Sequence, residues 1–99
     1  MTTKLLTLII THFACGDIAE QRMLSAVEVH YCSAIYQEIK LAFVPGIDPK
    51  TYVSLPIDQQ HSVNQEGYLA FRAWRIDNPA TVAHLERVAR GEAKLGVAS

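Results

Sequence analysis

The stretch between Gly16 and Pro45 contains neither glycine nor proline, and it limits what this 99-residue chain can fold into more than any other feature. Apolar side chains recur in it every three or four residues, the spacing that places them on one face of a helix. They are Leu24, Val27, Tyr31, Ile35, Ile39 and Ala42. Asp17 can cap the start of such a helix, and Pro45 stops it. The pattern therefore predicts one long helix over residues 17–43.

A shorter helix is expected over residues 62–75. Ser62 begins it, with Gln65 at the position from which a side chain completes a capping box. Its apolar face consists of Val63, Gly67, Ala70, Phe71 and Trp74.

A third helix is expected over residues 79–90. Asn78 and Pro79 mark its start, since asparagine caps helices and proline is tolerated in a first turn. Its apolar face consists of Val82, Leu85, Val88 and Ala89. Gly91 ends it, and a flexible tail is expected after this glycine.

Two segments favour strands. Residues 4–12 are rich in threonine and isoleucine, which are typical of buried strands, although threonines that repeat every four residues leave a helix as the alternative. Residues 51–57 alternate apolar and polar side chains, and Pro56 would confine such a strand to a sheet edge. The expected fold is α+β, with three helices and one or two short strands in a single domain over residues 1–99. An all-α fold is the alternative.

Composition and charge argue against several classes of protein. Hydrophobic residues make up 49% of the chain and charged residues 19%, a balance typical of a globular domain rather than a disordered one. The formal net charge is −1, without the cluster of basic residues that binds nucleic-acid phosphates. No apolar run approaches the length of a membrane-spanning helix. Neither nucleic-acid binding nor membrane insertion is expected.

The two cysteines, Cys15 and Cys32, are too few for a disulfide-rich secreted scaffold, so both are expected to be reduced and the protein to be cytoplasmic. His12 and His30 would complete the four ligands of a structural zinc site. His30 and Cys32 stand two residues apart, however, and such residues point to different sides of a helix. Neither a metal nor another cofactor is therefore expected.

The lack of a chemical signature favours a non-enzymatic function. The leading hypothesis is a small regulatory or inhibitory protein that forms a homodimer and binds a protein partner, for example by holding a regulator or an enzyme inactive. The end of the long helix and the edge strand would supply the contact, because each would leave apolar or hydrogen-bonding groups exposed. The expected partner-binding residues are Ile39, Phe43, Thr51, Val53, Leu55 and Ile57.

Two other functions are alternatives. Residues 63–90 are two predicted helices joined by a short turn, as in a helix-turn-helix DNA-binding regulator, and Arg87 and Arg90 could contact phosphates. The turn lacks the glycine that is common in this motif. The second alternative is a small enzyme with Cys15 as nucleophile, because a predicted helix start follows this residue and helix starts activate thiols.

Overall fold

The computed structural model describes residues 1–95 and contains five helices, with no strand in that part of the chain. In chain order they are α1 (Thr3–Gln21), α2 (Ala26–Ala42), α3 (Pro49–Val53), α4 (Ile57–Asp77) and α5 (Pro79–Ala89). The expected α+β fold is therefore wrong, and the all-α alternative is confirmed. None of these helices is both long and apolar enough to cross a membrane.

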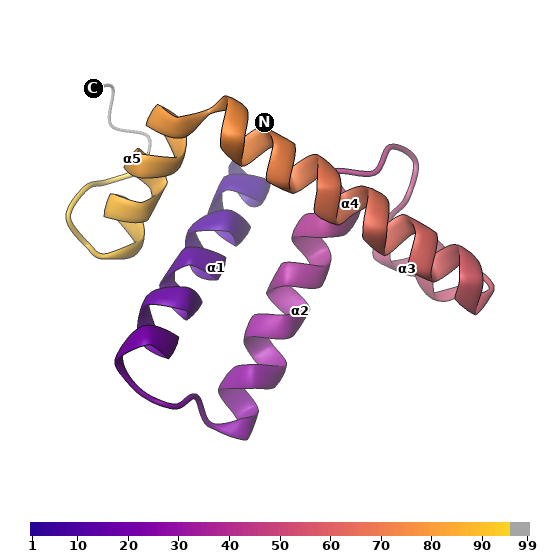
Figure 1. Ribbon diagram of the computed structural model, residues 1–99, viewed down its shortest axis with the longest axis horizontal. Helices are drawn as coiled ribbons and strands as arrows, with labels where there is room; N and C mark the ends of the chain where they lie inside the picture. The colour runs from indigo at the N-terminus through magenta and orange to yellow at the C-terminus, as the bar shows by residue number, and fades with distance from the viewer. Residues whose placement is uncertain (96–99) are drawn as a thin grey trace.

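The helices are arranged around an antiparallel hairpin of α1 and α2 (Figure 1). α4 lies across the end of this hairpin where α1 begins and α2 ends, and α5 lies beside α1. The buried apolar side chains connect these helices. They are Ile9, Phe13, Ile39, Leu41, Val44, Phe71 and Leu85. Neither α4 nor α5 reaches the opposite end of the hairpin, where α1 turns into α2.

Residues 4–12 belong to α1 instead of forming the expected strand. The hydroxyl of Thr7 donates a hydrogen bond to the carbonyl oxygen of Thr3 (2.9 Å), and the hydroxyl of Thr11 donates one to that of Thr7 (2.9 Å). The repeated threonines thus bond along the helix, as threonine side chains do when they lie in one. Packing against both α2 and α5 outweighs the strand preference of the isolated segment, because helical spacing turns its apolar side chains towards both neighbours.

The expected helix over residues 17–43 is wrong, because the chain turns at residues 22–25. Ser25 and Glu28 form a capping box, in which the Glu28 amide donates to the Ser25 hydroxyl (3.2 Å) and the Ser25 amide donates to the Glu28 carboxylate (2.8 Å). The Arg22 guanidinium donates two further hydrogen bonds to this carboxylate, at 2.9 and 2.6 Å. These bonds, those from Arg22 foremost, lower the pKa of Glu28 to about 2. The capping box of Ser25 and Glu28 therefore starts α2 here, as a helix separate from α1.

The expected edge strand over residues 51–57 is also wrong, because α3 and the start of α4 occupy this segment. The Asp48 carboxylate accepts a hydrogen bond from the Thr51 amide (2.7 Å), and Pro49 occupies the first turn of α3. An acidic cap followed by proline favours the start of a helix. This local signal outweighs the alternation of apolar and polar residues that follows it.

α4 begins at Ile57 rather than at Ser62, and a break at Asn78 separates it from α5. The prediction of the break is confirmed, but that of the cap is wrong. The Asn78 side chain donates a hydrogen bond to the carbonyl oxygen of Trp74 (2.8 Å) and caps no amide of α5. Gly91, with a φ of 75°, follows the end of α5 as predicted. Of the tail expected to be flexible, residues 96–99 lie outside the described part of the chain.

Cys15 of α1 and Cys32 of α2 form a disulfide, so the expectation of two reduced cysteines is wrong. The turn between the two helices brings their Cα atoms to 6.1 Å, within the range that a disulfide spans. A count of cysteines contains no information on this approach, which depends on the chain folding back as a hairpin.

Gly67 allows the backbones of α4 and α2 to touch. A Cβ atom on this residue would lie 2.7 Å from the carbonyl carbon of Lys40 and 3.0 Å from its Cα atom. Only glycine permits so close an approach of two backbones. One turn further along α4, Phe71 enters the core and is 2% exposed.

Removal of the disulfide is expected to destabilise the protein. The Cys15→Ala/Cys32→Ala variant should lose about 3 kcal/mol of unfolding free energy, because the crosslink restricts the unfolded chain over a separation of 17 residues. Urea denaturation of the oxidised wild type and the variant measures the difference. A reductant should weaken the wild type similarly and leave the variant unchanged. Equal stability of the oxidised wild type and the variant would contradict the prediction.

Gly67→Ala should lower the free energy of unfolding by about 1–3 kcal/mol, the usual cost of overpacking. Alanine favours helices over glycine by about 1 kcal/mol. The net loss of stability therefore comes from the clash between the added Cβ atom and the backbone of Lys40. Gly16→Ala is the matched control, since a Cβ atom at this position within α1 has no neighbour within 4 Å. It should stabilise the protein. Thermal denaturation that shows Gly67→Ala to be as stabilising as Gly16→Ala would rule out the close contact.

Candidate functional site

A groove of about 640 Å³ opens where α4 and α5 meet over α2. Its walls include Tyr36 from α2, Arg72 and Arg75 from α4, and Val82 and Glu86 from α5. The one-residue break between α4 and α5 creates it, because the two helices diverge from that point (Figure 1). A volume of this size is typical of small-molecule sites in proteins.

Arg75 lies over two aromatic rings at the edge of the groove. Its guanidinium carbon is 5.3 Å from the ring centre of Phe13 and 5.7 Å from that of Phe71. Both distances are within the range of a cation–π interaction. The rings therefore lie beneath the charged group, while the Arg75 side chain as a whole stays exposed.

The α4 wall of the groove is positively charged. Neither Arg72 nor Arg75 belongs to an ion pair among residues 1–95, and both side chains are exposed. Glu86 is the sole acidic residue among those that line the groove. Asp17 and Glu20 line a smaller recess on the other side of Arg75, together with Glu86. The lining of the groove thus carries two positive charges and one negative charge, and two further carboxylates lie on the far side of Arg75.

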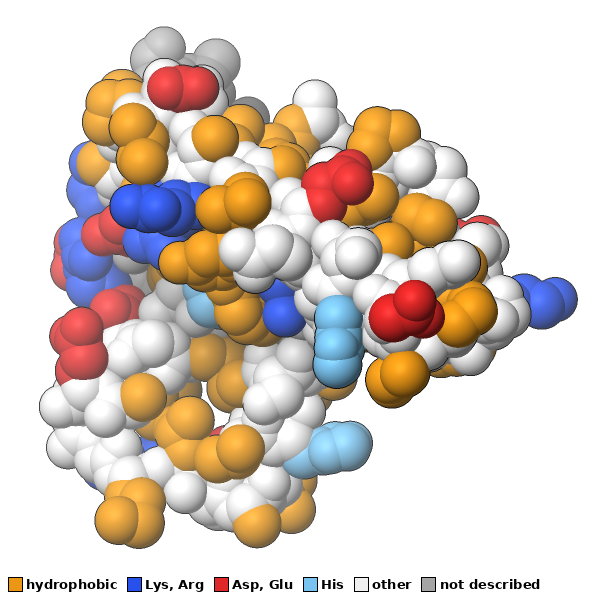
Figure 2. Space-filling view, turned by 45° about the vertical axis from the view of Figure 1, so that its right-hand side comes forward, with side chains coloured by type: hydrophobic (Ala, Val, Ile, Leu, Met, Phe, Trp, Pro, Cys, Tyr) orange, Lys and Arg blue, Asp and Glu red, His pale blue; other side chains and the backbone are white. Residues whose placement is uncertain are grey.

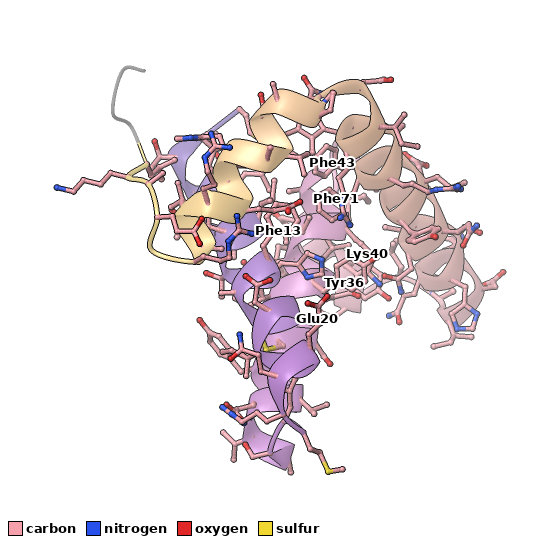
Figure 3. The ribbon with its side chains drawn as sticks, turned by 60° about the vertical axis from the view of Figure 1, so that its left-hand side comes forward. Phe13, Glu20, Tyr36, Lys40, Phe43 and Phe71 are labelled. Carbon is pink, nitrogen blue, oxygen red and sulfur yellow. A yellow bond between two sulfur atoms is a disulfide. The ribbon has the colours of Figure 1, made fainter. Side chains whose placement is uncertain are left out.

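The ring of Tyr36 connects the groove to the core. The His12 imidazole stacks on it with ring centres 4.8 Å apart and 9° between the planes, and the Lys40 ammonium lies 4.7 Å from its centre. Figure 3 shows Phe71, Lys40 and Tyr36 close together inside the angle between the helices. Burial raises the pKa of the Tyr36 hydroxyl, and the nearby Tyr68 adds to this rise. Tyr36 is thus a partly buried side chain that borders both the groove and the core.

A second surface is apolar and uncovered. We call it the open end of the α1–α2 hairpin and define it by Ile18, Met23, Leu24, Val27 and Tyr31. Met23 is 91% exposed, Val27 78% and Tyr31 55%. A hollow of about 390 Å³ lies between the two helices here. Figure 2 shows hydrophobic side chains gathered at this end of the molecule, at the bottom of the view.

The apolar face expected between residues 17 and 43 is buried only in part. Ile39 is fully buried and Ile35 is half-buried, but Val27 and Tyr31 are exposed. The spacing correctly identifies an apolar helix face. It does not indicate that the helices available to cover this face reach only one end of the hairpin.

The six residues expected to bind a partner do not form one surface, because no edge strand brings them together. Ile39 is fully buried and the ring of Phe43 packs 5.5 Å from that of Phe71, so both face the core. Thr51 and Leu55 are half-buried, whereas Val53 and Ile57 are exposed on α3 and at the start of α4.

The structure also bears on the two alternative functions. Cys15 has no free thiol to act as a nucleophile, because it is bonded to Cys32. α4 and α5 are joined by Asn78 alone, whereas the turn of a helix-turn-helix motif has about three to four residues. Within residues 1–95, no three metal-ligating side chains are gathered at one point.

Sequence reasoning did not single out Arg72 and Arg75. A signal for them exists, since residues three apart in a predicted helix share one face. Their apposition to Glu86 and Val82 of α5 has no such signal, because it depends on the angle between two helices.

Comparison of the chain with known proteins gives no match to a family model, to a curated protein or to a solved structure. Its function is therefore inferred from the groove and the open end of the hairpin.

Acid is expected to destabilise the protein through His12. Burial, with the positive charge of Arg75 adding to it, lowers the pKa of His12 below its ordinary value of 6.5. Below that pH the unfolded chain binds a proton that the folded chain does not, so the free energy of unfolding falls as the pH drops through 6.5 towards the folded-state pKa. Above pH 6.5 the effect vanishes, since His12 is neutral in both states.

His12→Phe keeps an aromatic ring against Tyr36 and removes the titration. Urea denaturation of both proteins between about pH 5 and 8 isolates the contribution of His12 from that of the other histidines. The wild type should lose more stability than the variant in the acidic half of this range. Parallel pH profiles would show that His12 titrates alike in both states.

Proposed function

We propose that this chain is a small non-enzymatic protein that regulates or inhibits by protein–protein contact, and that it forms a homodimer through the open end of its α1–α2 hairpin. The observation that carries the proposal is the apolar face of α2, which no other described part of the chain covers. Val27 and Tyr31 occupy positions that helical spacing assigns to a buried side. Contiguous apolar surface of this kind marks interaction sites, because monomers generally avoid it.

The residue types of the open end support this function. Methionine and tyrosine are enriched at the centres of protein interfaces. Met23, at 91% exposure, has a flexible side chain that adapts to a facing surface. Tyr31 offers a large ring for packing and a hydroxyl that remains able to bond to solvent or to a partner.

A second copy of the chain fits the open end because the charges at its edge cancel. Arg22 and Glu28 neutralise each other through an ion pair of 2.6 Å. In a twofold dimer each patch faces its own copy, so an unpaired charge near the axis would repel itself. An apolar patch with an internally neutralised edge avoids this repulsion.

The disulfide supports a different location from the cytoplasmic one expected from the cysteine count. Disulfides persist in oxidising compartments and are rare in the cytosol. Cys15 and Cys32 line the hollow at the open end, so their bond holds the two halves of the proposed interface together. We therefore propose that the protein works in an oxidising compartment.

Light scattering at micromolar concentration should give twice the mass of the chain. Val27→Glu should reduce this to the mass of one chain, because it places like charges opposite each other across the twofold axis. The matched control is Val53→Glu, since Val53 on α3 is 71% exposed, close to the 78% of Val27, and lies outside the open end. This control should remain dimeric.

A monomeric wild type would contradict the proposed dimer. A dimer that dissociates with Val53→Glu and not with Val27→Glu would contradict the surface, and would indicate α3 instead. Circular dichroism should show the same helix content in both variants, because both valines are largely exposed.

A further inference from the structure

The groove between α2, α4 and α5 is separate from the proposed dimer interface. None of the residues that line it also lines the hollow at the open end of the hairpin. Two copies joined at their open ends would therefore leave both grooves accessible.

We infer that this groove binds a small amphipathic anion, a carboxylate on an aromatic or branched apolar body. The carboxylate is bound by Arg72 and Arg75, and the apolar body packs against Ile76 and Val82.

The two arginines select a carboxylate. They lie three residues apart on α4, so both guanidinium groups can approach one ligand from the same face of the helix. A guanidinium group binds a carboxylate through two parallel hydrogen bonds, a geometry that an ammonium group lacks. The rings of Phe13 and Phe71 lie beneath the Arg75 guanidinium and favour this position of the side chain.

The rest of the lining requires an apolar body on the ligand. Tyr36, Ile76 and Val82 face the groove, and the side chain of Ile76 is 66% exposed. A volume of about 640 Å³ accommodates a molecule much larger than an inorganic anion. Packing against these side chains contributes binding energy that acetate or phosphate does not gain.

Glu86 limits the charge that the ligand carries. It lines the groove from α5, on the wall opposite the arginines. A second negative charge on the apolar body would be repelled by its carboxylate. The preferred ligand is therefore a monoanion.

Titration of the isotopically labelled protein with 1-naphthoate, followed by amide NMR spectra, tests this inference. The probe is a monoanionic carboxylate on an aromatic body. Saturable shifts are expected at residues 68–76 and 82–86, which contain the walls of the groove. 1-Naphthalenemethanol, which has the same rings without the charge, should bind about tenfold more weakly. Acetate, which has the charge without the rings, should produce no saturable shifts.

Charge variants connect the binding to the arginines. Arg75→Gln and Arg72→Gln should each weaken 1-naphthoate binding by about tenfold. Glu86→Gln should strengthen it, because a repulsive charge is removed. The matched control is Arg87→Gln, since Arg87 is an exposed arginine of α5 that does not line the groove. This variant should bind as the wild type does.

The inference is overturned if 1-naphthoate produces no saturable shifts, or if the shifts occur at residues 23–31 of the open end. Equal binding of the uncharged alcohol would also overturn it, as would an equal loss in Arg87→Gln and Arg75→Gln. The same titration on Val27→Glu separates the groove from the dimer. Binding should be unchanged there, whether or not the wild type proves to be dimeric.

Discussion

The contact on which the rest of this structure depends is the one between α4 and the end of the α1–α2 hairpin. At Gly67 the backbone of α4 rests on that of Lys40, and only a residue without a Cβ atom permits this. The close approach carries Phe71 into the core, where its ring lies 5.5 Å from that of Phe43. α5 then continues beyond the break at Asn78 and packs beside α1. Both the core and the groove follow from this crossing.

A helix that crosses a hairpin at one end leaves the other end without a layer above it. Here hydrogen bonds and a disulfide, rather than buried apolar side chains, stabilise the end of the hairpin at which α1 turns into α2. Arg22 and Glu28 close the turn, and the disulfide joins Cys15 to Cys32. Such bonds stabilise the hairpin without removing its apolar side chains from water. The same arrangement thus accounts for a stable hairpin and for an exposed apolar surface suited to another chain.

The candidate sites could be predicted from the sequence only in part. The helical spacing of Val27 and Tyr31 identifies an apolar face, and the spacing of Arg72 and Arg75 places two charges together. Whether an apolar face is covered depends on which helices pack against it, and spacing within one helix contains no information on that. Phe43 is the opposite example. The sequence predicts that it contacts a partner, but its ring packs against Phe71 and Trp74 of α4 in the core.

The sequence by itself contains the local signals that start α2 and α3. Asp48-Pro49 and the box of Ser25 with Glu28 act over one helical turn, so their effect is present in the local sequence even where a competing pattern masked it. Only the tertiary structure decided which apolar faces are buried, that the two cysteines meet, and that Arg75 lies across a groove from α5. These features depend on the directions of helix axes. Contacts between residues far apart in the chain set those directions, and a short stretch of sequence cannot encode them.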